Sequence, residues 1–246
     1  MSTGVTRRSV LTALLLCTSA CRSSSSAPQV SPMDLRAHPR KVTSSSLRPG
    51  TSRVPLNNGR QGLLAVPDGK VSGLVVALHG AGGQPAGAAR LFDEVADRVG
   101  LVIPAPASTG TTWAMLRRGP DPDTPALDTA LDRLFQAHPF DPARVAIAGF
   151  SDGASYALSL GLANGDLFPK VVAFSPGFEA ADLHQGRPAF FITHGTRDEV
   201  LPISRTSRRL VPALRQNGYD VIYQEFAGGH AVPREFAIEA ADWIVR

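Results

Sequence analysis

The sequence predicts a three-layer α/β domain with a mainly parallel central sheet. Short apolar runs alternate along the chain with longer segments whose apolar residues recur at helical intervals, and this alternation is typical of βαβ units. Residues 74–78 form a continuous apolar run, as expected of a strand buried on both faces of a parallel sheet. The sequence shows neither an internal repeat nor a second hydrophobic core.

The strands are recognised by short apolar or alternating runs next to turn residues. The first follows the turn Asn57-Asn58-Gly59, and the last alternates polar with apolar residues. We expect strands at residues 61–66, 74–78, 101–103, 145–148, 171–174, 190–193 and 219–226. In such a fold, catalytic groups lie on loops at the carboxyl ends of the strands.

The helices are recognised by apolar residues on one face. In residues 124–137 the apolar face carries Leu127, Leu131 and Leu134, and Pro125 is tolerated in the first turn. Asn217-Gly218 is a typical helix end. We expect helices at residues 86–99, 124–137, 154–163, 204–216 and 231–245.

The amino terminus resembles a bacterial export signal. Residues 6–11 carry a twin-arginine pattern, and the apolar stretch 10–17 is too short to span a bilayer. Thr18-Ser19-Ala20-Cys21 resembles a lipobox, with Thr18 where Leu is usual. We expect residues 1–21 to be a twin-arginine signal with lipidation at Cys21; plain signal cleavage is the alternative. The protein would then be exported across the bacterial inner membrane and be periplasmic or at the cell surface, with a lipid anchor.

Charge and composition distinguish the amino-terminal 53 residues from the rest of the chain. Residues 1–53 carry eight Lys and Arg against one Asp, whereas residues 54–246 carry 17 Lys and Arg against 20 Asp and Glu. The basic excess suits an anionic membrane surface, and the acidic remainder argues against nucleic-acid binding. We expect residues 22–53 to be a disordered tether and residues 54–246 to be the folded domain. Both cysteines, Cys17 and Cys21, precede that domain, so we expect no internal disulfide.

Gly149-Phe150-Ser151-Asp152-Gly153 lies between an apolar strand and a helix. This order of elements is that of a G-x-S-x-G nucleophile elbow, in which a strained turn presents the serine above the strand ends. An ordinary glycine-rich turn is the alternative. We expect Ser151 to be the nucleophile.

A serine nucleophile needs a base, and the base needs an orienting acid. His230 follows the last expected strand in a glycine-containing loop, and we expect it to be the general base and acid. Asp198 follows an earlier strand and is the expected orienting acid. Its neighbour Glu199 is the alternative candidate, and Asp220 is a weaker one. The order Ser, Asp, His is the one expected for this architecture. His79 and His194 each end a strand before a glycine, and we expect them to shape those turns by hydrogen bonding.

A tetrahedral oxyanion needs hydrogen-bond donors. The stretch Leu78-His79-Gly80-Ala81-Gly82-Gly83 bares backbone N–H groups after a strand. We expect the amides of Ala81 and Asp152 to form the oxyanion hole, with Gly82 as a neighbouring alternative that we place in the substrate pocket. A phosphate cradle is the alternative, but neither nucleotide-binding glycine motif is present.

Together, the 78–83 stretch, the elbow, the motif His194-Gly195-x-x-Asp198-x-x-x-Pro202 and Gly229-His230 resemble the α/β-hydrolase superfamily over residues 61–246. The chain looks most similar to the phospholipase/carboxylesterase (acyl-protein thioesterase-like) and dienelactone hydrolase-like group. Poly(hydroxyalkanoate) depolymerase-like and feruloyl esterase-like esterases are close by. The resemblance implies a metal-free, cofactor-free serine esterase or thioesterase with Ser151, Asp198 and His230 as its triad.

The chain departs from the thioesterase-like pattern at two places. Asp152 stands where glutamine is usual, which would disfavour anionic substrates. Residues 175–188 are too short for a helical lid, so we expect little or no lid. The longer loop 105–124, with Trp113, Met115, Arg117 and Arg118, is expected to form one wall of the substrate pocket; a core position for Trp113 is the alternative.

Two other functions compete with the esterase. A serine peptidase of the same fold often carries an extra propeller or cap domain, and we expect neither in this chain. A non-catalytic binding protein on a hydrolase scaffold has no need of Ser, Asp and His together. No His, Asp and Glu cluster has metal-ligand spacing. We therefore expect a small-molecule ester substrate and no metal.

Overall fold

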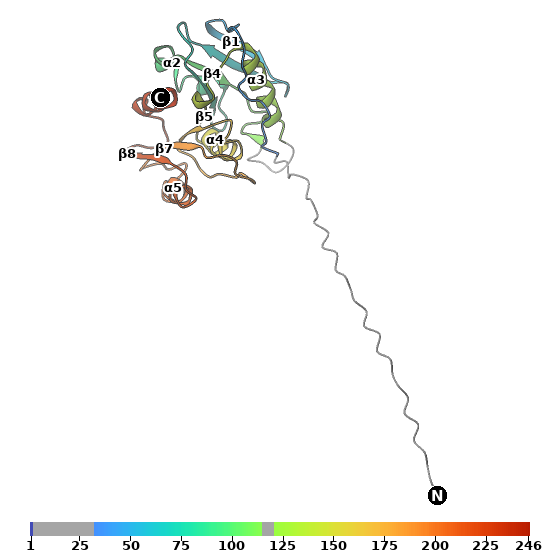
Figure 1. Ribbon diagram of the computed structural model, residues 1–246. Helices are drawn as coiled ribbons and strands as arrows, with labels where there is room; N and C mark the ends of the chain where they lie inside the picture. The colour runs from blue at the N-terminus through green and yellow to red at the C-terminus, as the bar shows by residue number, and fades with distance from the viewer. Residues whose placement is uncertain (2–31, 115–120) are drawn as a thin grey trace. The chain divides into compact units, whose positions relative to one another are not determined.

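The computed structural model describes Met1, residues 32–114 and residues 121–246 (Figure 1). Residues Ser31–Arg246 form one compact unit. Its strands are β1 Gly50–Pro55, β2 Gln61–Val66, β3 Gly73–Leu78, β4 Leu101–Ala105, β5 Val145–Phe150, β6 Lys170–Phe174, β7 Ala189–Gly195 and β8 Val221–Phe226. Its helices are α1 Pro85–Ala89, α2 Asp93–Val99, α3 Asp123–Ala137, α4 Asp152–Ala163, α5 Ser207–Gln216 and α6 Arg234–Val245, with a short 3-10 helix, η2, at Pro142–Arg144.

The strands form one mixed sheet in the order β1-β2-β4-β3-β5-β6-β7-β8 across the described residues. From β4 to β8 all neighbouring strands are parallel, whereas β2 is antiparallel to both β1 and β4. β1 lies at one end of the sheet and β8, next to α5, at the other (Figure 1). The expected mainly parallel α/β architecture is therefore confirmed.

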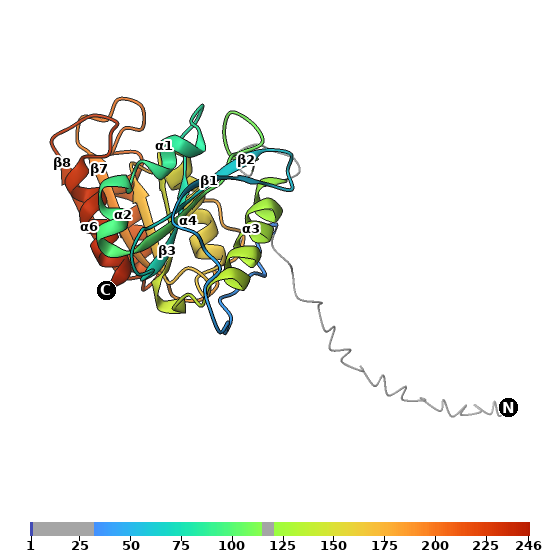
Figure 2. The same cartoon turned by 90° about the horizontal axis from the view of Figure 1, so that it is seen from above.

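Helices cover both faces of the sheet because its central strands are apolar on both sides. In β3, Leu74, Val76 and Leu78 pack on the same face as α3, α4 and α5. Val75 and Ala77 point to the opposite face, against α1, α2 and α6. Figure 2 shows α2 and α6 side by side on that second face. This alternation is the period of two expected for a strand between two layers.

The expected helix at residues 86–99 is wrong in one respect, because it is broken into α1 and α2. Leu91 and Phe92 donate their amide protons three residues back, to Ala88 and Ala89, so the α-helical pattern stops there. Phe92 is 1% exposed and packs in the core with Val95. The spacing of apolar residues therefore predicted the buried face correctly, but it did not predict the break between α1 and α2.

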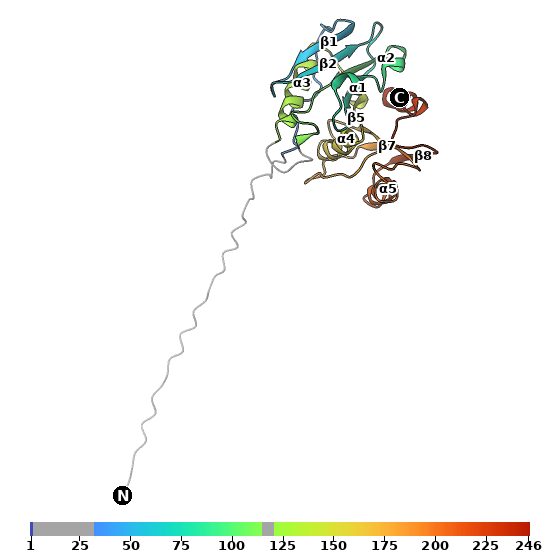
Figure 3. The same ribbon diagram turned by 180° about the vertical axis from the view of Figure 1, so that it is seen from behind.

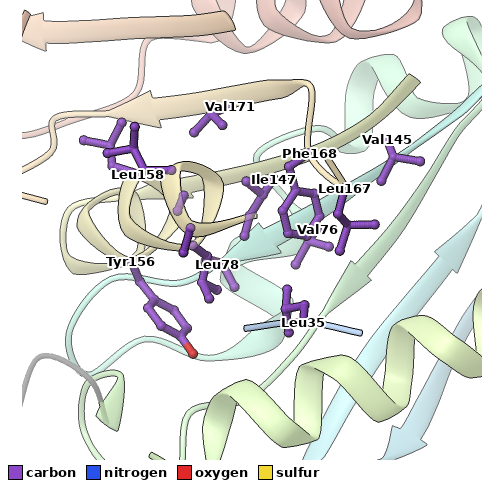
Figure 4. Close-up of a cluster of buried hydrophobic side chains, with 14 of the residues drawn as sticks. Leu35, Val76, Leu78, Val145, Ile147, Tyr156, Leu158, Leu167, Phe168 and Val171 are labelled. Carbon is purple, nitrogen blue, oxygen red and sulfur yellow. The ribbon is translucent and has the colours of Figure 1, made fainter. Parts of the chain in front are cut away.

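The prediction of a tether over residues 22–53 is wrong for residues 32–53. Leu35 is 4% exposed and lies among the core side chains of Val76 and Leu78 (Figure 4). The Asn164 side chain accepts from the Leu35 amide and donates to the Met33 carbonyl, both at 2.8 Å. β1 then pairs along its full length with β2 at the sheet edge, close to α3 (Figure 3). The folded unit therefore begins near Ser31 rather than at residue 54.

Apart from Met1, the expected export signal, including Cys21, lies outside the described residues, as do residues 22–31 of the expected tether. Within the described part of the chain, no helix is both long and apolar enough to cross a membrane.

Candidate active site

The turn between β5 and α4 holds Ser151 in a strained conformation. Its φ of 59° and ψ of −122° lie in a region that residues other than glycine rarely adopt. Such a conformation costs about 1–3 kcal/mol and persists only where the surroundings enforce it. The surroundings are tight: a Cβ on Gly149 would lie 2.2 Å from the Gly153 carbonyl carbon, and a Cβ on Gly153 would lie 2.3 Å from the Leu78 carbonyl oxygen. The sequence-predicted elbow is therefore present, with Ser151 at its apex.

The loops after β7 and β8 bring Asp198 and His230 together. His230 Nδ1 lies 2.6 Å from Asp198 Oδ2, so the ring donates to the carboxylate. The other oxygen, Oδ1, accepts from the amides of Val200 and Leu201 at 2.9 and 2.8 Å. The Asp198 side chain is fully buried, whereas that of His230 is 15% exposed. This pair has the geometry of a base and its orienting acid. Glu199 and Asp220, the alternative acids, are exposed.

Burial alone would raise the pKa of Asp198. Hydrogen bonds from His230 and from the Leu201 amide outweigh it and hold the pKa of this carboxyl below its usual value. Asp198 therefore stays ionised at neutral pH, next to the ring of His230.

A second histidine contacts the same carboxylate. His194 Nε2 lies 2.8 Å from the Leu201 carbonyl and 3.2 Å from Asp198 Oδ2, and its Nδ1 lies 2.7 Å from Ser207 Oγ. Both groups near Nε2 are acceptors, so Nε2 carries the proton and Nδ1 accepts from the Ser207 hydroxyl. His194 is fully buried, and this burial lowers its pKa, which keeps the ring neutral. The expectation that His194 shapes its turn is confirmed, but the contact with Asp198 was not foreseen.

Ser151 and His230 come from the loops after β5 and β8 and make no hydrogen bond with each other. The rings of His230 and Phe150, the residue before the nucleophile, lie with their centroids 4.6 Å apart. The Ser151 hydroxyl makes no hydrogen bond to any residue of the described ranges. Catalytic contacts of this kind are often long without substrate and tighten when it binds.

Two unengaged amides face the region of the nucleophile. Among the described residues, neither the Ala81 N–H nor the Asp152 N–H donates a hydrogen bond, whereas the Gly82 N–H donates to the Thr111 carbonyl at 2.6 Å. A Cβ on Gly80 would lie 3.2 Å from the Ser151 Cβ, so the loop that carries Ala81 lies directly against the serine. Ala81 and Asp152 therefore fit the role of oxyanion donors better than Gly82 does.

His79 fixes the loop that carries Ala81. Its Nδ1 lies 2.8 Å from the Gly80 carbonyl, and its Nε2 accepts from the Ser108 amide at 3.2 Å. Nδ1 therefore carries the proton, and the expectation that His79 shapes this turn by hydrogen bonding is confirmed. The ring also lies against the indole of Trp113, with centroids 4.7 Å apart.

Trp113 occupies a core position rather than a pocket wall. It is 1% exposed, donates its indole N–H to the His79 carbonyl at 2.9 Å and stacks on Tyr156. Trp113 therefore supports the loop that carries Ala81. The other residues expected in this wall, Met115, Arg117 and Arg118, lie outside the described residues.

The sequence reasoning missed a contact of Asp152. Thr112 Oγ1 donates to the Asp152 carboxylate at 2.6 Å and ties the 105–124 loop to the residue beside the nucleophile. No sequence pattern joins these two positions, which are 40 residues apart.

Across the described ranges, no three His, Cys, Asp or Glu side chains gather as a metal site.

Several solved structures resemble this chain. A fluorophosphonate-binding serine hydrolase of Staphylococcus aureus matches with a TM-score of 0.63 at 17% identity, over 81% of this chain and 100% of its own. A ferulic acid esterase of Anaeromyces mucronatus gives 0.57 at 17% identity over 87% and 96%. The carboxylesterase of Bacillus cereus gives 0.55 at 21% identity over 74% and 92%. The chain therefore has the α/β-hydrolase fold seen in serine esterases. No protein-family model matches the sequence, and no curated protein does.

Proposed function

We propose that this chain, an α/β-hydrolase in fold, is a serine hydrolase that cleaves carboxylic esters or thioesters. The observation that carries the proposal is that His230, hydrogen-bonded to the buried Asp198, packs its ring against Phe150, the residue before the strained Ser151. A surface serine in an ordinary turn has no reason to hold this backbone conformation, whose cost the surroundings must offset.

The roles follow from the geometry. His230 accepts the Ser151 proton as Oγ attacks the acyl carbonyl, and Asp198 stabilises the imidazolium that forms. The negative charge then develops on the carbonyl oxygen, next to the Ala81 and Asp152 amides. One such donor is worth about 3–4 kcal/mol in the transition state. His230 returns the proton to the leaving alcohol or thiol, and a water repeats the sequence to release the acid from Ser151.

Ester and thioester substrates fit the site's surroundings. Residues 175–188, between β6 and β7, contain no helix, so no helical lid covers the nucleophile from this side. The solved structures that share this fold include proteins described as esterases and as an acyl-protein thioesterase. These matches support the class of reaction and do not define the acyl group.

Hydrolysis of a p-nitrophenyl ester by wild type and by Ser151→Ala tests this function. We expect Ser151→Ala to lower kcat by about 10⁴-fold or more, since the nucleophile is lost while the oxyanion hole stays. The matched control is Ser204→Ala, because Ser204 is exposed and lies on a loop outside the triad. Retention of wild-type turnover by Ser151→Ala would remove Ser151 from the mechanism.

We also propose that the protein is exported through its twin-arginine signal and anchored by a lipid on Cys21. The support is the sequence pattern of residues 6–21 alone. Metabolic labelling of expressing cells with an alkyne fatty acid should mark the wild type and not Cys21→Ser. Equal labelling of both proteins, or labelling of neither, would contradict lipidation at this position.

A further inference from the structure

A hollow of about 400 Å³ opens beside the proposed oxyanion loop. Its walls include Arg53 of β1, Arg60 and Gln61 at the start of β2, and Gln84 just before α1. α1 packs beside β2, as the view from behind also shows (Figure 3). The hollow is therefore formed where the antiparallel edge hairpin meets the segment that follows the oxyanion loop.

The topology puts this hollow on the same edge of the sheet as the nucleophile. β2 runs antiparallel to β4, with Leu63 opposite Ala105, the last residue of β4. The beginning of β2 therefore lies at the carboxyl end of the parallel strands, where Ser151 also lies. Arg60, which immediately precedes β2, is carried to that edge by the same pairing.

The residues that line the hollow carry positive charge and no negative charge. Arg53 and Arg60 are the charged residues that line it, and no carboxylate does. Both are exposed, and neither guanidinium makes an ion pair or hydrogen bond with any residue in the described ranges. By contrast, Arg208 makes a two-pronged contact with Glu225. Two guanidinium groups without a counter-charge present the planar donors that bind carboxylate or phosphate.

A second hollow, which shares one lining residue with the first, lies at the proposed oxyanion loop. A cavity of about 210 Å³ is lined by Gly80, Ala81 and Phe150, the residue before the nucleophile. Gln84 lines both hollows. Burial lowers the pKa of His79; the Gly80 hydrogen bond and the negative charge of Asp123 oppose this shift, and the positive charge of Arg60 adds a smaller lowering. Because Gln84 lines both hollows, the two arginines belong to the surroundings of a substrate held at Ala81.

We propose that Arg53 and Arg60 bind an anionic group, a carboxylate or a phosphate, at the far end of the ester substrate. This inference rests on the proposed esterase function and names its substrate class. Asp152 acts in the opposite sense, because its carboxylate lies next to the nucleophile and repels negative charge close to the scissile bond. The preferred substrate is therefore neutral at the ester and negatively charged at a distance from it.

Paired esters test the proposal. In each pair, one ester ends in a carboxylate or a phosphate and the other ends in a neutral group of equal length. The terminal group is on the acyl side of the ester in some pairs and on the alcohol side in others. In at least one pair we expect kcat/KM of the wild type to be about five- to tenfold higher for the anionic member, from charge-assisted hydrogen bonds at a partly solvated site. Added salt should reduce this preference.

The variants are Arg53→Gln, Arg60→Gln and their double variant, with Arg209→Gln as the matched control. Arg209 is an exposed arginine on α5, which lies at the β8 end of the sheet. We expect the double variant to lose the anionic preference and to keep the wild-type kcat/KM for the neutral members, while Arg209→Gln keeps both.

The outcomes separate this inference from the function on which it rests. Hydrolysis of the neutral members without any anionic preference, or a preference that survives in the double variant, would overturn the inference and leave the esterase intact. Failure of the wild type to hydrolyse any ester would overturn both. A preference for only the carboxylate or only the phosphate series would support the site and identify the group that it binds.

Discussion

Replacing Asp198 by asparagine removes one charge from the site and changes almost no volume. The structure determines how the new amide would lie. Two backbone amides, from Val200 and Leu201, point at the Oδ1 position, so the amide oxygen must take that place. The NH2 group then takes the Oδ2 position, where it meets His230 Nδ1 and the protonated Nε2 of His194.

This orientation forces the wrong tautomer on His230. A donor opposite Nδ1 requires that nitrogen to accept, so the proton moves to Nε2 and the ring can no longer take the proton of Ser151. Flipping the amide would instead set its NH2 against two backbone N–H groups. We expect kcat to fall by about 10⁴-fold, equivalent to about 5.4 kcal/mol in the activation free energy.

The assay is ester hydrolysis at saturating substrate, with Glu199→Gln as the control. Glu199 is an exposed neighbour, so this variant makes the same charge change without touching the base. We expect its kcat to stay within about twofold of wild type. If Asp198→Asn kept wild-type kcat while Glu199→Gln lost it, the assignment of the orienting acid would be wrong.

Three further predictions follow from packing and titration. Gly153→Ala should lower both stability and kcat, since its Cβ would lie 2.3 Å from the Leu78 carbonyl oxygen and displace the proposed oxyanion loop. The control Gly87→Ala, whose Cβ would lie 4.0 Å from the Arg90 guanidinium, should leave the urea midpoint unchanged or raised. Burial lowers the pKa of His194, so as the pH falls this residue takes up a proton in the unfolded chain at a higher pH than in the folded protein. The free energy of unfolding should therefore fall as the pH drops below about 6.5. Urea titrations at pH 5 and 7.5 test this, and His194→Gln should weaken the dependence. Incubation with EDTA should leave ester hydrolysis unchanged, and a loss that a divalent ion restores would contradict a mechanism carried by side chains alone.

The sheet and the Asp198–His230 contact were predictable because both depend on patterns that are local in sequence. Continuous apolar runs such as 74–78 identify buried strands, and the order of elements fixes which loops meet at the carboxyl edge. That edge brings the loops after β7 and β8 together, which is why Asp198 and His230 meet.

The order of residues 32–53 was not predictable from local patterns, because distant residues impose it. Asp128 Oδ1 accepts from the amides of Arg36 and Ala37 at 2.8 Å, across more than 90 residues of sequence in each case. Without these partners the segment has the composition of a linker, rich in Ser, Pro and Arg. The same limit applies to His194, whose contact with Asp198 accompanies hydrogen bonds to Leu201 and Ser207 that no local pattern indicates.

Labelling with a fluorophosphonate probe tests the central claim most directly, because the probe reacts with a serine only when a base and an oxyanion hole activate it. The measurement is intact mass and peptide mapping of wild type, Ser151→Ala, His230→Ala and Ser204→Ala after exposure to the probe. We expect one adduct per molecule, on Ser151, in wild type and Ser204→Ala, and none in the other two variants. A folded wild type that stays unlabelled, or an adduct on another serine, would contradict the proposed active site.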